Sequence, residues 1–159
     1  MNNTENNNLN NWAISDKLYE WILSNINKGQ TILEFGSGTG TIELCKYYNM
    51  YSIEHDEKYM NLAEKSNYIL APIKNGWYDI DKIKDNIPNY DLLLIDGPPG
   101  NIGRSGFLKH LDIFNLNVPI IIDDTNRVSE NELAMTLAEH LGKNMEEIKD
   151  GNGSFIIIK

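Results

Sequence analysis

Cysteine and basic residues are scarce in this chain, and no long apolar run occurs in it. The single cysteine, Cys45, cannot form a disulfide within the chain, which excludes the disulfide-rich class of small domains and fits a reducing compartment. No apolar run approaches the roughly 20 residues that a membrane-spanning helix needs, and the basic and apolar regions of a signal peptide are missing. We therefore expect a cytoplasmic protein that does not contact a membrane.

The shortage of positively charged residues bears on which kinds of molecule this protein can bind. Lysine and arginine number 14 against 23 aspartates and glutamates, which gives a net charge of −9. Proteins that grip a phosphate backbone usually present a basic surface, so nucleic acid is not an expected partner. The 159 residues suffice for one domain with a core. Residues 1–11 are mostly asparagine and cannot bury enough apolar surface, so we expect a disordered arm before a single domain over residues 12–159.

Strand patterns alternate with helix patterns along the rest of the chain. The expected strands are Thr31–Phe35, Met50–Glu54, Tyr68–Ile73, Tyr90–Ile95 and Val118–Ile122. The expected helices are Asp16–Asn25, Thr41–Tyr48, Glu57–Ser66, Gly106–Asn115 and Ser129–Leu141. A turn is expected at Asn75-Gly76, then a loop with a short helix over residues 77–87. Segments Met145–Lys149 and Ser154–Ile158 flank a Gly-rich turn, which predicts an antiparallel hairpin. The pattern predicts an α/β fold, a mostly parallel sheet with helices on both faces.

The stretch Thr31-Ile-Leu-Glu-Phe-Gly-Ser-Gly-Thr-Gly40 joins the first of these strands to a helix through a glycine-rich turn. A dinucleotide fingerprint would need glycine at position 41, where Thr41 stands. Glu34, two residues before the first glycine, would repel a pyrophosphate but suits a cationic ligand. The pattern resembles the first motif of class I S-adenosylmethionine (SAM) methyltransferases, whose ligand carries a sulfonium and an amino group. The resemblance implies SAM as cofactor, held by the residues of this turn: Glu34, Gly36, Ser37, Gly38 and Gly40.

The same resemblance covers nearly the whole chain after Trp12. It implies a Rossmann-like, seven-stranded sheet completed by the terminal hairpin. Glu54 follows Gly36 by 18 residues and ends the second expected strand, where an acid can accept both hydroxyls of a ribose. In class I methyltransferases the matching acid binds the SAM ribose, so the resemblance assigns that role to Glu54. His55 is a candidate contact of the adenine.

Three aspartates follow the fourth and fifth expected strands. Asp96 ends Asp91-Leu-Leu-Leu-Ile-Asp96, and Asp123 and Asp124 follow Ile120-Ile-Ile. These strands are neighbours in the expected sheet, so the three carboxylates should converge and repel each other. Mg²⁺ or Mn²⁺ would relieve that repulsion. Metal-dependent O-methyltransferases of the catechol type have acids at matching positions, although asparagine is common where Asp124 stands. In the alternative, one aspartate is a base and the others pair with Arg104 and Arg127.

The motifs Leu-Glu-Phe-Gly-Ser-Gly, Asp-Gly-Pro-Pro-Gly and Asp-Asp-x-x-Arg, together with Arg104, resemble small bacterial-type methyltransferases related to sugar and glucuronoxylan O-methyltransferases. This resemblance implies O-methylation of a small polar acceptor, a sugar or a phenol, with Asp96, Arg104 and Asp123 as catalytic residues. Two alternatives stay open. Asp-Gly-Pro-Pro resembles the Asp-Pro-Pro-aromatic motif of amino-group methyltransferases that act on nucleic acid, with Gly100 in place of the aromatic. The third hypothesis is a SAM-binding module without turnover.

Overall fold

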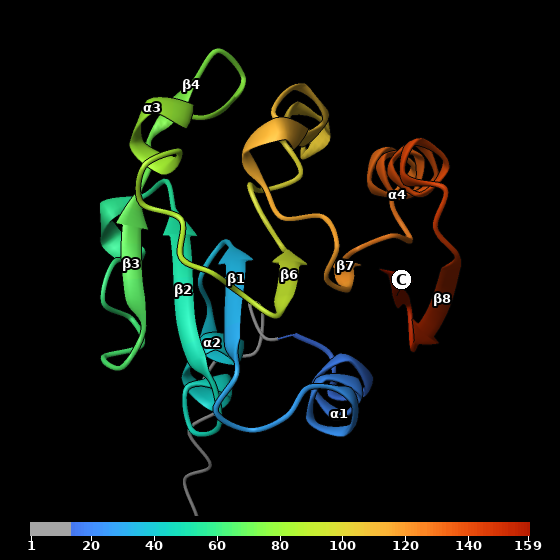
Figure 1. Cartoon of the computed structure of the whole chain (residues 1–159), viewed down its shortest axis with the longest axis horizontal. Coiled ribbons are helices and arrows are strands. Elements are labelled where there is room, and N and C mark those ends of the chain that lie inside the picture. Colours follow the sequence, from blue (N-terminus) through green and yellow to red (C-terminus); the bar gives the residue numbers. More distant parts are fainter. Residues whose placement is uncertain (1–13) are drawn as a thin grey trace, which may run out of the picture.

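The computed structural model describes residues 14–159, so the arm expected over residues 1–11 lies outside the described residues. Within them, seven strands form one sheet in the order β3-β2-β1-β6-β7-β9-β8 (Figure 1). The strands are β1 Thr31–Phe35, β2 Asn49–Glu54, β3 Asn67–Leu70, β6 Leu92–Ile95, β7 Ile120–Ile122, β8 Met145–Asp150 and β9 Gly153–Ile158. The first five are parallel to one another, and β9 runs antiparallel between β7 and β8. The predicted mostly parallel sheet and its terminal hairpin are confirmed.

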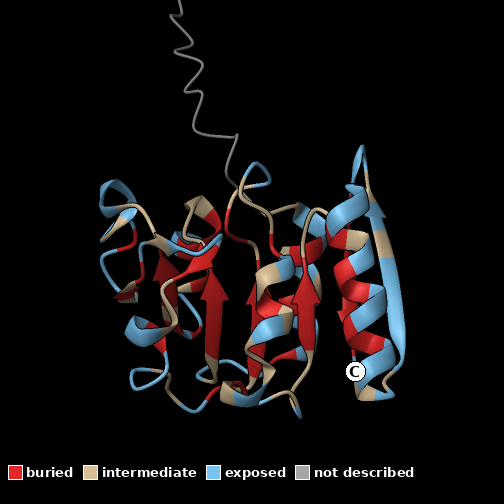
Figure 2. Cartoon of the chain, turned by 90° about the horizontal axis from the view of Figure 1, so that it is seen from above, coloured by how far each residue is buried: buried red, intermediate tan, exposed pale blue. Residues whose placement is uncertain are grey.

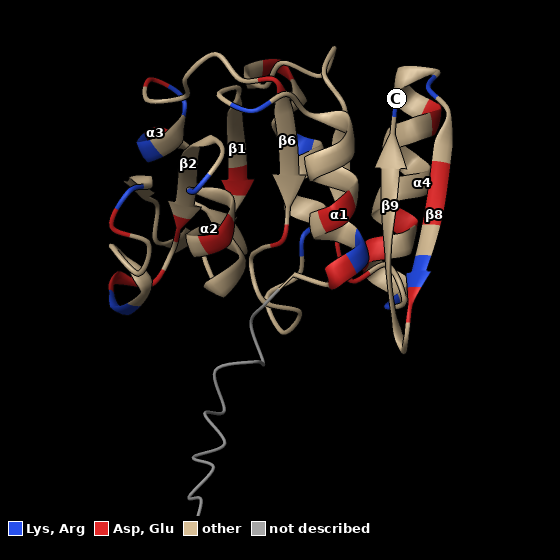
Figure 3. Ribbon diagram, turned by 90° about the horizontal axis from the view of Figure 1, so that it is seen from below, with Lys and Arg blue, Asp and Glu red and all other residues tan. Residues whose placement is uncertain are grey.

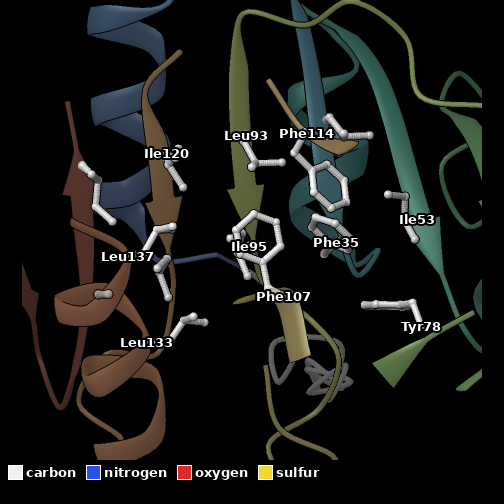
Figure 4. Packing of buried hydrophobic residues seen from close by; sticks show 14 of the residues in the cluster. Phe35, Ile53, Tyr78, Leu93, Ile95, Phe107, Phe114, Ile120, Leu133 and Leu137 are labelled. Carbon is white, nitrogen blue, oxygen red and sulfur yellow. The ribbon is translucent and has the colours of Figure 1, made fainter. Parts of the chain in front are cut away.

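Helices cover both faces of this sheet, as predicted. The α-helices are α1 Asp16–Asn25, α2 Thr39–Leu44, α3 Ile80–Ile83 and α4 Val128–Leu141. One face packs α1 and α2 through Leu18, Ile22 and Leu44. The other packs α4 through Leu133 and Leu137, beside an aromatic group formed by Phe35, Phe107 and Phe114 (Figure 4). The strands β1, β6, β7 and β9 between these layers are almost wholly buried, which explains their mostly apolar sequences, whereas the edge strand β8 is mostly exposed (Figure 2).

Three predicted helices are wrong in kind or extent. The helix expected over Glu57–Ser66 is only the short 3₁₀ turn η2, Glu57–Tyr59, and Asn61 then takes a left-handed φ of +64° that ends any helix. The helix expected over Gly106–Asn115 is two 3₁₀ turns, η3 Ser105–Lys109 and η4 Leu111–Ile113. The helix expected over Thr41–Tyr48 is α2, which begins and ends earlier.

The third expected strand, Tyr68–Ile73, is too long at its end, and a small hairpin begins at Ile73 instead. Strand β3 ends at Leu70, and Pro72, which has no N–H to donate, follows it. The chain then forms β4, Ile73–Lys74, and β5, Trp77–Tyr78, which pair antiparallel in a separate two-stranded sheet. The turn at Asn75-Gly76 is confirmed, and both residues have the positive φ values, +55° and +82°, of a tight hairpin turn. The hairpin brings Trp77 and Tyr78 against Phe35.

Candidate functional site

A cavity of about 450 Å³ opens where β1, β2, β6 and β7 end. Chain order reverses between β1 and β6, and ligands of open α/β sheets bind at such switch points. The volume lies in the range of small-molecule sites. Eight residues predicted as site residues line it: Gly36, Ser37, Glu54, His55, Asp96, Arg104, Asp123 and Asp124. The wall also includes residues that we did not predict, among them Tyr78 and Asn101.

The glycine turn lets β1 and β6 approach each other at the cavity floor. Gly36 has a φ of +85°, and a Cβ on it would lie 2.8 Å from the carbonyl oxygen of Asp96. Only glycine fits that position without a shift of the backbone. Gly38 precedes α2 and donates its N–H to Thr41 Oγ1 (3.1 Å). Gly40 packs beneath Ile14 and is not part of the cavity wall described here.

Glu34 lies behind this turn rather than on the cavity wall. Its Oε1 accepts hydrogen bonds from Thr41 Oγ1 and Ser52 Oγ, both at 2.6 Å, and the residue is 3% exposed. Burial raises the pKa of Glu34 to about 7, and the two hydroxyl donors oppose that rise. Because Thr41 also accepts the Gly38 N–H, Glu34 supports the shape of the turn.

Glu54 is held at the end of β2 by backbone donors. Oε1 accepts the N–H groups of His55 (2.8 Å) and Asp56 (3.0 Å), and Oε2 accepts the Ser37 N–H (3.0 Å). Acidic residues mark the ends of both β1 and β2 in Figure 3. A carboxylate carries about four lone-pair positions, so Glu54 retains acceptor capacity toward the cavity. This arrangement fits the hydroxyls of a ribose.

Arg104 contacts all three of the predicted aspartates. Its guanidinium is almost fully buried, and Nη2 lies 2.8 Å from Asp124 Oδ2 and 3.4 Å from Asp96 Oδ1. Nη1 donates to the Asp123 carbonyl oxygen (2.8 Å) and Nε to the Pro98 carbonyl oxygen (3.2 Å). Arg127 Nη1 adds a second contact to Asp124 Oδ2 at 3.2 Å.

These contacts do not fit the predicted Mg²⁺ or Mn²⁺ site. The carboxylates of Asp96 and Asp124, two of the three proposed ligands, already face the Arg104 guanidinium. Within residues 14–159, no group of three or more histidine, cysteine, aspartate or glutamate side chains is arranged to hold a metal ion. The arrangement matches the alternative in which two aspartates pair with arginines. A divalent cation would have to displace Arg104 from them.

Asp123 is left as the unpaired carboxylate of this group. Among the described residues, its Oδ1 accepts the Asp124 N–H (2.8 Å), and no ion pair involves its side chain. Burial raises the pKa of Asp123 to about 6, and the bond from the Asp124 N–H opposes the rise. Burial also raises the pKa of Asp96 well above its usual range, helped by the charge of Asp123. The cavity thus holds two carboxyl groups with raised pKa values, one that faces Arg104 and one that has no ion pair among the described residues.

Sequence reasoning missed Tyr78 and Asn101. The signal for Tyr78 was present, because Asn75-Gly76 is typical of a hairpin turn, and the second strand of that hairpin would carry Trp77 and Tyr78. Asn101 follows the Gly-Pro-Pro-Gly segment, which the sequence marks as a loop without indicating which of its residues border the cavity.

No protein-family model and no curated protein matches the sequence. Solved structures do match. A candidate caffeoyl-CoA O-methyltransferase from Staphylococcus aureus has a TM-score of 0.57 and 14% identity, over 95% of this chain and 87% of its own. A ribosomal protein L11 methylase from Lactobacillus delbrueckii subsp. bulgaricus has a TM-score of 0.60 and 18% identity, over 90% and 77%. A candidate tRNA methyltransferase from Streptococcus pneumoniae, solved with SAM, has a TM-score of 0.59 and 20% identity, over 91% and 72%. The chain has the class I SAM-dependent methyltransferase fold.

Proposed function

We propose that this chain is a SAM-dependent methyltransferase that methylates an oxygen atom of a small polar acceptor. One observation carries the proposal. A single cavity at the switch point of the sheet joins the anchored carboxylate of Glu54 to the unpaired carboxylate of Asp123. The first suits a ribose and the second suits a proton acceptor. The methyltransferase fold supports the same conclusion.

The chain's own residues can bind the cofactor across the ends of β1 and β2. Glu54 would accept the ribose hydroxyls, His55 would border the adenine, and the turn at Gly36 and Ser37 would pass close beneath the ligand. SAM, when bound, supplies an electrophilic methyl group on a positively charged sulfur. Asp96, with 30% of its side chain exposed, faces the same cavity.

Asp123 is the better placed general base. An acceptor hydroxyl must lose its proton as its oxygen is methylated, and Asp123 has a carboxylate oxygen that no arginine occupies. The Asp96 carboxylate faces the Arg104 guanidinium, which occupies one of its oxygens, although burial raises the pKa of Asp96 well above its usual range. Arg104 positions the rim by holding Asp124 and the Asp123 backbone, so no metal ion is required to offset the carboxylates.

The acceptor end of the cavity favours a sugar over a phenol. Asn101, Asp123, Asp124 and Arg127 line this end, and their hydrogen-bonding groups suit the hydroxyls of a carbohydrate. A phenol ring would need apolar walls on both faces. The net charge of −9 gives no support to nucleic acid as the acceptor.

Titration calorimetry with SAM and its demethylated product tests the proposal. We expect micromolar binding of both, and Glu54→Ala should weaken it by roughly 1–3 kcal/mol, because buried hydroxyls would lose their acceptor. Binding without methyl transfer to any sugar would favour the module without turnover. An absence of binding in the folded wild-type protein would refute the methyltransferase proposal.

A further inference from the structure

One tyrosine in the cavity wall carries a hydroxyl that has no hydrogen-bond partner among residues 14–159. Tyr78 ends β5, is 2% exposed and lines the cavity. Its buried hydroxyl is among the few polar side-chain atoms that have no hydrogen-bond partner in the described part of the chain. Buried polar groups are nearly always paired, so this exception requires a cause.

Packing around the Tyr78 ring and hydroxyl fixes the position of the hydroxyl oxygen. The Tyr78 ring packs against Phe35 and Trp77, with centroids 5.4 Å away in each case, and against His55 at 6.2 Å (Figure 4 shows the Phe35 contact). On the opposite side, a Cβ at Gly97 would collide with the hydroxyl. The oxygen therefore lies above the Gly97 backbone, where β1 and β6 end side by side.

The Tyr78 phenol lies between the two functional ends of the cavity, because its ring packs against His55, which follows Glu54, and its hydroxyl lies over Gly97, which follows Asp96. Burial raises the pKa of Tyr78 well above its usual value, and the carboxylates of Glu54 and Asp96 add to the rise while Arg104 opposes it. The group therefore keeps its proton at neutral pH. It presents one donor and two acceptor positions at the cavity wall.

We propose that the Tyr78 hydroxyl is a cofactor-binding group that contacts the sulfur-bearing part of SAM. This inference rests on the proposed function. If Glu54 holds the ribose and Asp123 receives the acceptor proton, the sulfur lies between them, and so does Tyr78. The ribose ring oxygen can accept a hydrogen bond from the phenolic O–H. The polarised C–H groups beside the positive sulfur can approach the phenolic oxygen as weak donors.

The variant Tyr78→Phe tests this inference, because it removes only the hydroxyl. We expect its affinity for SAM to fall about fivefold, and its affinity for the demethylated product, whose sulfur carries no charge, to fall less. The ligand-free variant should melt no lower than the wild-type protein, because it loses an unpaired buried group. Calorimetry and thermal unfolding without ligand measure the two effects.

Tyr90 provides the matched control. It is also buried, but its hydroxyl donates to the Asn115 carbonyl oxygen at 3.0 Å. Tyr90→Phe should lower the melting temperature and leave the affinity for SAM unchanged. If the wild-type protein binds SAM and Tyr78→Phe binds it within twofold, the inference about Tyr78 is wrong and the proposed function stands. If the folded wild-type protein does not bind SAM, both are wrong.

Discussion

At the scale of single residues, Arg104 defines the site more than any aspartate does. The sequence placed three carboxylates at one rim and indicated that a positive charge must offset them. The structure supplies that charge from within the chain, through a side chain that is only 3% exposed. A guanidinium suits this task because its planar donors can serve two carboxylates and two carbonyl groups at once.

Replacing Arg104 by methionine should lower the free energy of unfolding by about 3 kcal/mol, because Asp96 and Asp124 would lose their shared cation. Urea denaturation measures the change, and adding Asp124→Asn should recover part of it. Arg127→Met is the control. Its half-exposed side chain pairs with the same Asp124, so the loss should stay below about 1 kcal/mol. If Mn²⁺ bound tightly to the wild-type rim, as seen by electron paramagnetic resonance, our interpretation of Arg104 would be wrong.

At the scale of elements, the sequence predicted the strands better than the helices. The central strands are apolar and buried on both faces, so their patterns leave little choice, and β1 begins and ends as predicted. The helix α1 was also predicted correctly because Ser15 caps it, with its Oγ accepting the Leu18 N–H. The segments at residues 57–66 and 106–115 carry helical spacing but form 3₁₀ turns, because tertiary contacts and backbone angles at Asn61 and His110 override local preference.

For the candidate site, the positions of residues at strand ends could be predicted from the sequence, but their side-chain partners could not. Residues that follow strands, such as Glu54 and Asp96, could be placed because parallel strands end at one edge of the sheet. The partner of each side chain could not be predicted. Nothing in the sequence spacing shows that Glu34 accepts hydrogen bonds from Thr41 and Ser52, or that Arg104 pairs with Asp124, which follows it by 20 residues.

The turn of the β4–β5 hairpin requires a residue that tolerates a positive φ. Gly76 has a φ of +82° and open space around its α-carbon, so Gly76→Ala should cost about 1 kcal/mol through backbone strain alone. Gly153, beside the tip of the β8–β9 hairpin, has no positive φ, and a Cβ there would lie 3.6 Å from the nearest atom. Gly153→Ala should therefore be nearly neutral. Equal losses in urea denaturation of the two variants would contradict the role assigned to the turn.

At the scale of the whole molecule, the buried acid Glu34 couples folding to pH. Its pKa rises from an ordinary 4.5 in the unfolded chain to about 7 in the folded protein. The folded state therefore binds the proton more tightly, and its stability decreases as the pH rises through this interval. The difference of about 2.5 pKa values corresponds to roughly 3 kcal/mol between acid and alkaline conditions.

The variant Glu34→Gln isolates this effect, because glutamine does not titrate but keeps an oxygen that can accept from Thr41 and Ser52. Denaturation of both proteins at pH 5 and pH 8 measures it. We expect the stability of the variant relative to the wild-type protein to increase between these conditions by roughly 2–3 kcal/mol. Contributions from Asp96 and Asp123 occur in both proteins and cancel in the difference. Parallel pH profiles would show that Glu34 is ionised in the folded protein, and a cationic ligand would then be the natural partner for the turn that it supports.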